Sequence, residues 1–120
     1  MKKNERKPVL AAIADRIVRF AAEGNYSKVV VQTLGEPEAR EFWYDELDGL
    51  AAEILATGGA SVTFYRYENL GGGKGVDRMV DWFLFVPGNG RDALSHAAGL
   101  DALAFIESTD NWLDWHYPVA

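Results

Sequence analysis

The stretch that decides the fold is SVTFYRYENLGGGKGVDRMVDWFLFV, residues 61–86. Its two ends, residues 61–67 and 79–86, are rich in the aromatic and β-branched side chains that are typical of strands. Between them, residues 71–75 include four glycines, which give the backbone high conformational entropy and no side chains to pack. We therefore expect an antiparallel hairpin, with residues 69–77 as a long, mobile and solvent-exposed tip that binds no nucleotide.

The chain before this hairpin is expected to contain a helix and then a buried strand. Residues 8–23 have apolar side chains at spacings of three and four, which predicts a helix that begins at Pro8. Gly24-Asn25 suits the end of that helix. Its apolar stripe would consist of Leu10, Ile13, Ile17, Phe20 and Ala21. Residues 28–34, KVVVQTL, are predicted as a strand because β-branched residues dominate them.

Residues 37–56 allow two interpretations. A period of 3.6 residues separates apolar from acidic side chains, which predicts a single helix. Its inner side would hold Trp43, Leu47, Leu50 and Ile54. Its outer side would carry an acidic row with no basic residue inside it, formed by Glu38, Glu41, Asp45 and Asp48. The alternative is a hairpin in which residues 42–44 form a second strand.

The remaining segments complete the expected fold class. Residues 91–98 are predicted as a short helix, residues 102–108 fit either a helix or a strand, and Asp110 would cap a last turn. The order α-β-α-β-β-α, with or without a final strand, predicts an α+β two-layer sandwich. In it, a mixed or antiparallel sheet of three to four strands packs against two main helices. Residues 8–120 would form one domain after a flexible basic tail, residues 1–7.

Composition excludes several classes of function. The chain has 120 residues and 48 % hydrophobic residues, which fits one domain with a real core and excludes global disorder. No apolar run reaches the roughly 18–20 residues of a membrane span, and no secretory signal pattern is present, so we expect a cytoplasmic protein. The absence of cysteine excludes disulfides and thiol chemistry. A net charge of −6 argues against direct binding of nucleic acid.

No motif predicts a catalytic residue, a metal site or a cofactor. The glycine-rich stretch lacks the Ser or Thr that a Walker loop needs after its lysine, because Gly75 follows Lys74. Two histidines supply too few ligands for a typical metal site. The alternative hypothesis is a small enzyme or ligand-binding domain with a pocket near the hairpin and the C-terminal segment. That pocket would use Tyr65, Tyr67, Asp81, His96, Asp114 and His116.

The favoured hypothesis is a non-enzymatic acidic binding protein. Residues 36–53 contain seven acidic side chains and one basic side chain, and such a surface steers association with a basic partner. We expect an inhibitor of the immunity-protein or phage counter-defence type, which masks the basic surface of a nuclease or a nucleic-acid-binding complex. The expected partner-binding residues are Glu38, Glu41, Asp45, Asp48, Tyr65, Tyr67 and Lys74.

Overall fold

A single five-stranded antiparallel sheet forms the base of the molecule. The computed structural model of the chain describes residues 6–118, with side chains described from residue 9 onward. The strands are β1 (Lys28–Thr33), β2 (Ala39–Trp43), β3 (Ala60–Gly71), β4 (Lys74–Phe85) and β5 (Leu94–Ala98). Their order in the sheet is β2-β1-β3-β4-β5, with every neighbouring pair antiparallel. Two hairpins therefore lie side by side, and β5 adds an edge next to β4.

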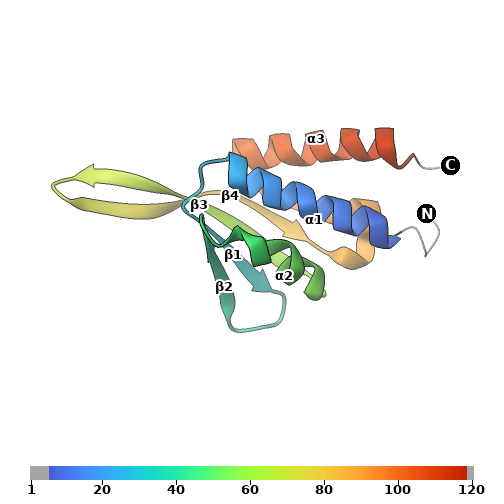
Figure 1. Cartoon of the computed structure of the whole chain (residues 1–120), viewed down its shortest axis with the longest axis horizontal. Helices are drawn as coiled ribbons and strands as arrows, with labels where there is room; N and C mark the ends of the chain where they lie inside the picture. Colours follow the sequence, from blue (N-terminus) through green and yellow to red (C-terminus); the bar gives the residue numbers. More distant parts are fainter. Residues whose placement is uncertain (1–5, 119–120) are drawn as a thin grey trace.

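Three α-helices cover one face of this sheet (Figure 1). They are α1 (Arg6–Glu23), α2 (Leu50–Ala56) and α3 (Leu100–His116), with α1 lying between the other two. Short 3₁₀ helices, Leu47–Gly49 and Pro87–Asp92, precede α2 and β5. The arrangement confirms the predicted α+β class, with five strands instead of three to four. Among the described residues, no helix combines the length and apolar character needed to cross a membrane.

The core lies between the helices and the inner face of the sheet. Ile13, Ile17 and Ala21 of the predicted α1 stripe are buried, and Leu10 and Phe20 are partly buried at its margin. Alternate strand residues point inward, as the period of two along a strand requires. The buried apolar residues of the sheet are Val29, Val31, Phe42, Ala60, Val62, Phe64, Phe83, Phe85 and Leu94. The two predicted strands of residues 61–67 and 79–86 thus supply much of the core.

The prediction of one helix over residues 37–56 is wrong. Residues 39–43 form the edge strand β2, which pairs with β1 so that Phe42 lies opposite Val29. Pairing with β2 satisfies the outer backbone hydrogen-bonding groups of β1, which a helix at this place would leave without partners. Only residues 50–56 are α-helical, and Leu50 and Ile54 are buried there as expected. The alternative hairpin interpretation was the correct one.

Further predictions need correction. The loop expected over residues 69–77 is instead a pair of strands joined by Gly72-Gly73. Residues 69–76 are exposed, as expected. Both glycines have positive φ, 60° and 77°, which matches the type I′ turn that suits the twist of a hairpin.

Residues 91–98 form a 3₁₀ turn and the strand β5, not the expected helix. Residues 102–108 belong to one long helix, α3, which passes through Asp110 without a new cap. The helix α1 begins at Arg6, and residues 1–5 of the expected tail lie outside the described part.

Candidate functional site

The β3–β4 hairpin extends beyond the rest of the sheet as a two-stranded arm, residues 66–79. β1 pairs with β3 only as far as Tyr65, and β5 pairs with β4 only over residues 82–85. The arm therefore projects past the helices (Figure 1), in a molecule that is 57 Å long but 29 Å and 23 Å across. Arg78 donates to Glu68 across its two strands. Its large apolar side chains are exposed: Tyr67, Leu70, Val76 and Met79.

A hollow of about 410 Å³ lies at the base of the arm. We call it the root hollow; it is lined by Ala21, Ala22, Asn25, Tyr26, Ser27, Tyr44, Leu47 and Tyr67. Asn25 has a φ of 56°, which turns the chain sharply between α1 and β1. Tyr44 and Tyr67 are 71 % and 61 % exposed, so two aromatic side chains border the hollow without being buried in the core.

An acidic segment, residues 44–48, forms one wall of the root hollow. The backbone N–H of Tyr44 donates to the Ser27 carbonyl (3.0 Å), and the N–H of Glu46 donates to the Trp43 carbonyl (2.8 Å). This turn at the end of β2 presents Tyr44 and Leu47 toward the hollow. The intervening and following carboxylates, those of Asp45, Glu46 and Asp48, are exposed. The Glu46 carboxylate accepts a hydrogen bond from the Trp43 backbone N–H (3.4 Å), and those of Asp45 and Asp48 have no ion pair within the described residues.

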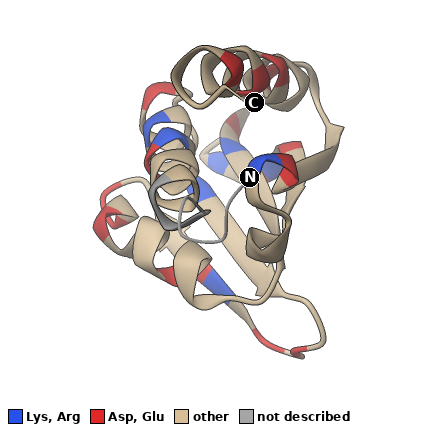
Figure 2. Ribbon diagram, turned by 90° about the vertical axis from the view of Figure 1, so that its right-hand side faces the viewer, with Lys and Arg blue, Asp and Glu red and all other residues tan. Residues whose placement is uncertain are grey.

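The other acidic residues of the expected surface lie farther along β2. Glu38 is exposed in the β1–β2 loop, where Figure 2 shows a further acidic region at the lower end of the molecule. Glu41 forms an ion pair with Lys28 across the strands (3.2 Å). The expected helical row of four unpaired carboxylates is therefore wrong, because a strand, a turn and a 3₁₀ helix divide its members and one of them is paired.

Tyr65 and Lys74 lie away from the root hollow. Tyr65 is half-buried on the sheet face that no described helix covers, and its ring packs 4.8 Å from the Lys28 ammonium. Trp43 lies on the other side of the same ammonium, at 5.3 Å. Lys74 is exposed at the far end of the arm, next to the Gly72-Gly73 turn. Of the expected partner-binding residues, only Tyr67 lines the root hollow, and Asp45 and Asp48 are chain neighbours of its lining residues Tyr44 and Leu47.

The residues of the alternative pocket do not come together. Asp81 is buried beside Tyr26 and the start of α3, whereas Asp114 pairs with Arg91 and His116 stacks on Trp112 near the end of that helix. Fourteen residues separate Ala102 from His116, about 21 Å along a helix. The described residues contain no group of three His, Cys, Asp or Glu side chains that could hold a metal ion.

Asp81 has a structural position that the sequence patterns did not indicate. It is 2 % exposed, and its carboxylate accepts hydrogen bonds from the Tyr26 hydroxyl (2.7 Å) and the Ala102 backbone N–H (2.8 Å). Burial is the main cause that raises the pKa of Tyr26 above its usual value, and the hydrogen bond to Asp81 raises it further. Gly99 approaches Asp81 so closely, with a φ of 99°, that a side chain would collide with it. Asp81 thus joins β4 to the α1–β1 connection and to α3, and both of its carboxylate oxygens accept hydrogen bonds in these contacts.

Tyr26, Tyr44 and Leu47 are the residues of the site that sequence reasoning missed. Tyr44 and Leu47 were assigned to a helix, whose geometry would have turned them differently. The signal that could have found them is the run Phe42-Trp43-Tyr44, since three consecutive aromatic residues favour a strand. Comparisons of the chain with family models, curated proteins and solved structures found no match.

Proposed function

We propose that this protein is a non-enzymatic binding protein that masks a basic surface of a nucleic-acid-handling protein. The observation that supports the proposal is the root hollow, which Tyr44, Leu47 and Tyr67 help to line. The exposed residues Asp45 and Asp48 directly follow Tyr44 and Leu47 in the chain. Protein interfaces are commonly built in this way, with aromatic anchors in a hollow and a polar rim around them.

The chemistry of the hollow favours a lysine or arginine side chain as its occupant. The aliphatic stem of such a side chain would pack against Leu47 and Tyr44. Its cationic end would meet the faces of the tyrosine rings and the neighbouring carboxylates. Proteins that bind nucleic acid use the same cationic side chains for phosphate contacts. A partner bound here would therefore lose part of its phosphate-binding surface.

The wider charge pattern adds steering to this local contact. Residues 36–53 carry seven acidic side chains against one basic side chain, and Arg40 is paired with Glu53 (3.1 Å). Glu38 adds a further exposed carboxylate at the other end of β2, in the β1–β2 loop. Such a field accelerates encounter with a basic surface. We assign the protein to the class of cytoplasmic inhibitors that includes immunity proteins and phage counter-defence proteins.

The test compares two double charge reversals that change the net charge equally. D45K/D48K alters the rim of the root hollow, whereas D15K/E107K alters exposed carboxylates on α1 and α3. Each immobilised variant is incubated with a nuclease-treated extract of the source cell, and captured proteins are then purified. A candidate partner counts only if its affinity for nucleic acid falls when the wild-type protein is added.

For that purified partner, D45K/D48K should weaken binding by about tenfold or more at low salt, and D15K/E107K by much less. The difference should shrink at high salt, because the Debye length falls from about 10 Å at 0.1 M to about 3 Å at 1 M. Y44A should also weaken binding, with little dependence on salt. Equal losses in the two double reversals, or a partner that still binds nucleic acid fully in the complex, would refute the proposal.

A further inference from the structure

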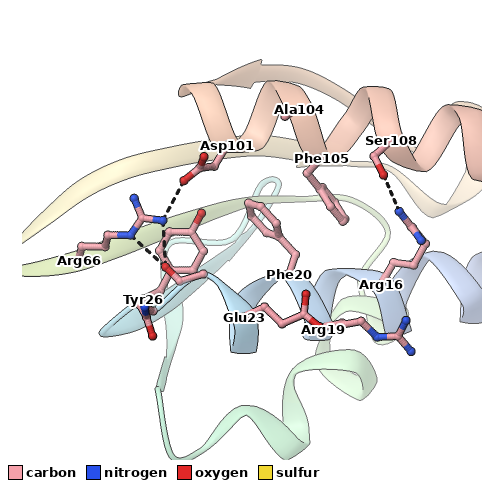
Figure 3. Close-up of a pocket in the computed structure, with 12 residues that line it drawn as sticks. Arg16, Arg19, Phe20, Glu23, Tyr26, Arg66, Asp101, Ala104, Phe105 and Ser108 are labelled. Atoms are coloured by element: carbon pink, nitrogen blue, oxygen red, sulfur yellow. Dashed lines mark hydrogen bonds and ion pairs between the residues drawn. The ribbon is translucent and has the colours of Figure 1, made fainter.

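A second concave feature lies on the opposite side of α1, between α1 and α3. It is a cavity of about 620 Å³, a size typical of small-molecule sites. Figure 3 shows α3 above it and α1 below it, with Phe20 and Phe105 reaching toward each other at its centre. Their rings stack at a centroid distance of 4.5 Å and form an aromatic floor.

Three arginines line this cavity, in a protein with a net charge of −6. Arg66 lies at one end, where it donates to the Gly24 carbonyl and pairs with Asp101 (2.8 Å). Arg16 and Arg19 lie at the other end (Figure 3). The cavity therefore has one end whose arginine is paired with a carboxylate. At the other end, the Arg16 guanidinium points toward α3 and the Arg19 side chain points away from it (Figure 3).

Arg16 and Arg19 differ from every other arginine whose side chain is described. Each of the other four has a carboxylate oxygen within 4 Å, and these four are Arg40, Arg66, Arg78 and Arg91. Within the described residues, neither Arg16 nor Arg19 has such a partner. Arg16 is partly buried and Arg19 is exposed, and their like charges repel each other. Both residues line the cavity, which Glu23 also lines without an ion pair to either arginine within the described residues.

Arg16 is also held in place by neutral hydroxyl groups. Its Nε donates to the Thr109 hydroxyl (3.2 Å), and its Nη2 donates to the Ser108 hydroxyl (3.1 Å). The guanidinium lies 5.0 Å from the centre of the Trp112 ring. Burial and the nearby charge of Arg19 lower the pKa of Arg16. These contacts fix the guanidinium without neutralising it, and its other N–H groups remain free to donate.

We propose that the cavity between α1 and α3 binds a small organic anion, with its phosphate or carboxylate group held by Arg16 and Arg19 and its apolar part over Phe20 and Phe105. Guanidinium groups match both oxyanions through paired, charge-assisted hydrogen bonds. The anion would also relieve the repulsion between the two arginines. The cavity shares Asn25 and Tyr26 with the lining of the root hollow, but Arg16 and Arg19 do not line that hollow. The inference does not depend on the proposed function.

The test uses three probes that share one ring but differ in charge: phenyl phosphate, benzoate and benzyl alcohol. Each is titrated into the ¹⁵N-labelled protein while amide and arginine Nε signals are followed by NMR. We expect phenyl phosphate or benzoate to saturate at or below about 10 mM and to shift signals of Arg16, Arg19 and Phe105. If one of these two anions binds more tightly, its charged group, phosphate or carboxylate, is the one that the cavity prefers. Benzyl alcohol should bind at least about tenfold more weakly.

Substitutions then test the two arginines separately. R19Q removes an exposed charge and is expected to fold normally, whereas R16Q also removes the bonds to Ser108 and Thr109. Each should weaken anion binding by about tenfold, and R40Q, on the distant strand β2, should leave it unchanged. R16K should restore little of the anion binding that R16Q loses, because the lysine ammonium lacks the planar pair of N–H donors of a guanidinium. No binding at about 10 mM, equal binding of benzyl alcohol, or equal loss in R40Q and R19Q would overturn the proposal.

Discussion

The two halves of the β3–β4 hairpin have the same local structure and opposite environments. In the covered half, Phe64, Phe83 and Phe85 are fully buried beneath the helices. In the arm, residues 66–79, the strands pair only with each other, and Tyr67 and Met79 are more than 60 % exposed. A two-stranded hairpin is marginally stable by itself. The covered half also pairs with β1 and β5. The difference shows that cover by helices, together with pairing to further strands, makes one half a core and leaves the other half exposed.

The largest expected effect comes from removing a core ring in the covered half. Phe83 contacts Phe64 and Phe105 at centroid distances of 5.3 Å and 5.6 Å. Phe83→Ala should lower the free energy of unfolding by about 3–5 kcal/mol. Met79→Ala, four residues earlier on the same strand, should change it by no more than about 0.5 kcal/mol. Urea denaturation measures both. Similar losses of unfolding free energy in the two variants would contradict the division of the hairpin into a covered half and an exposed arm.

A second prediction concerns the polar junction of the covered half. Asp81→Ala would leave the Tyr26 hydroxyl and the Ala102 N–H without their acceptor in a buried place. We expect a loss of about 2–4 kcal/mol in the free energy of unfolding, because each unsatisfied buried group costs about 1–3 kcal/mol. Asp77→Ala, at the same strand's arm end, is the matched control. A loss as small as that of the control would show that Asp81 does not join the helices to the sheet.

The same junction should make stability depend on alkaline pH. The pKa of Tyr26 is higher in the folded protein than in the unfolded chain. Above about pH 10, the unfolded chain therefore loses the hydroxyl proton of this tyrosine while the folded protein keeps it. The contribution is fully present below that pH, and it declines above it by up to about 1.4 kcal/mol per pH unit. Tyr26→Phe loses the bond to Asp81 at neutral pH but has no such decline. The free energies of unfolding of the wild type and of Tyr26→Phe should therefore converge as the pH rises from 8 to 11. A constant difference between the two proteins over this range would exclude the coupling.

The smallest effect on global stability is expected at the tip of the arm. Gly72 has a φ of 60°, which asparagine tolerates and valine does not. Gly72→Val should speed hydrogen exchange of the arm amides by about tenfold, since the local strain is about 1–2 kcal/mol. Core amides should exchange as in the wild type, and Gly72→Asn should alter neither group. A fall in protection of the core would mean that the arm and the covered half unfold together.

Local patterns were sufficient for several elements of this fold. The period of apolar residues in α1 fits only a helix, and the β-branched run of β1 fits only a strand. The structure contains both elements. The two halves of residues 61–86 are strands for the same reason. Charge and composition likewise indicated a strongly acidic segment, residues 36–53. These features depend on neighbours within a few residues, so the amino-acid sequence by itself determined them.

Tertiary structure decided the segments whose local pattern fitted two states. Residues 39–43 have a helical period, yet they form β2 because pairing with β1 satisfies backbone groups that are distant in the sequence. The same long-range pairing made residues 94–98 the edge strand β5. Tyr26 meets Asp81 across 55 positions, and Arg16 meets Thr109 across 93. Such contacts form only when helices pack on the sheet, so the root hollow and the arginine-lined cavity are properties of the folded chain.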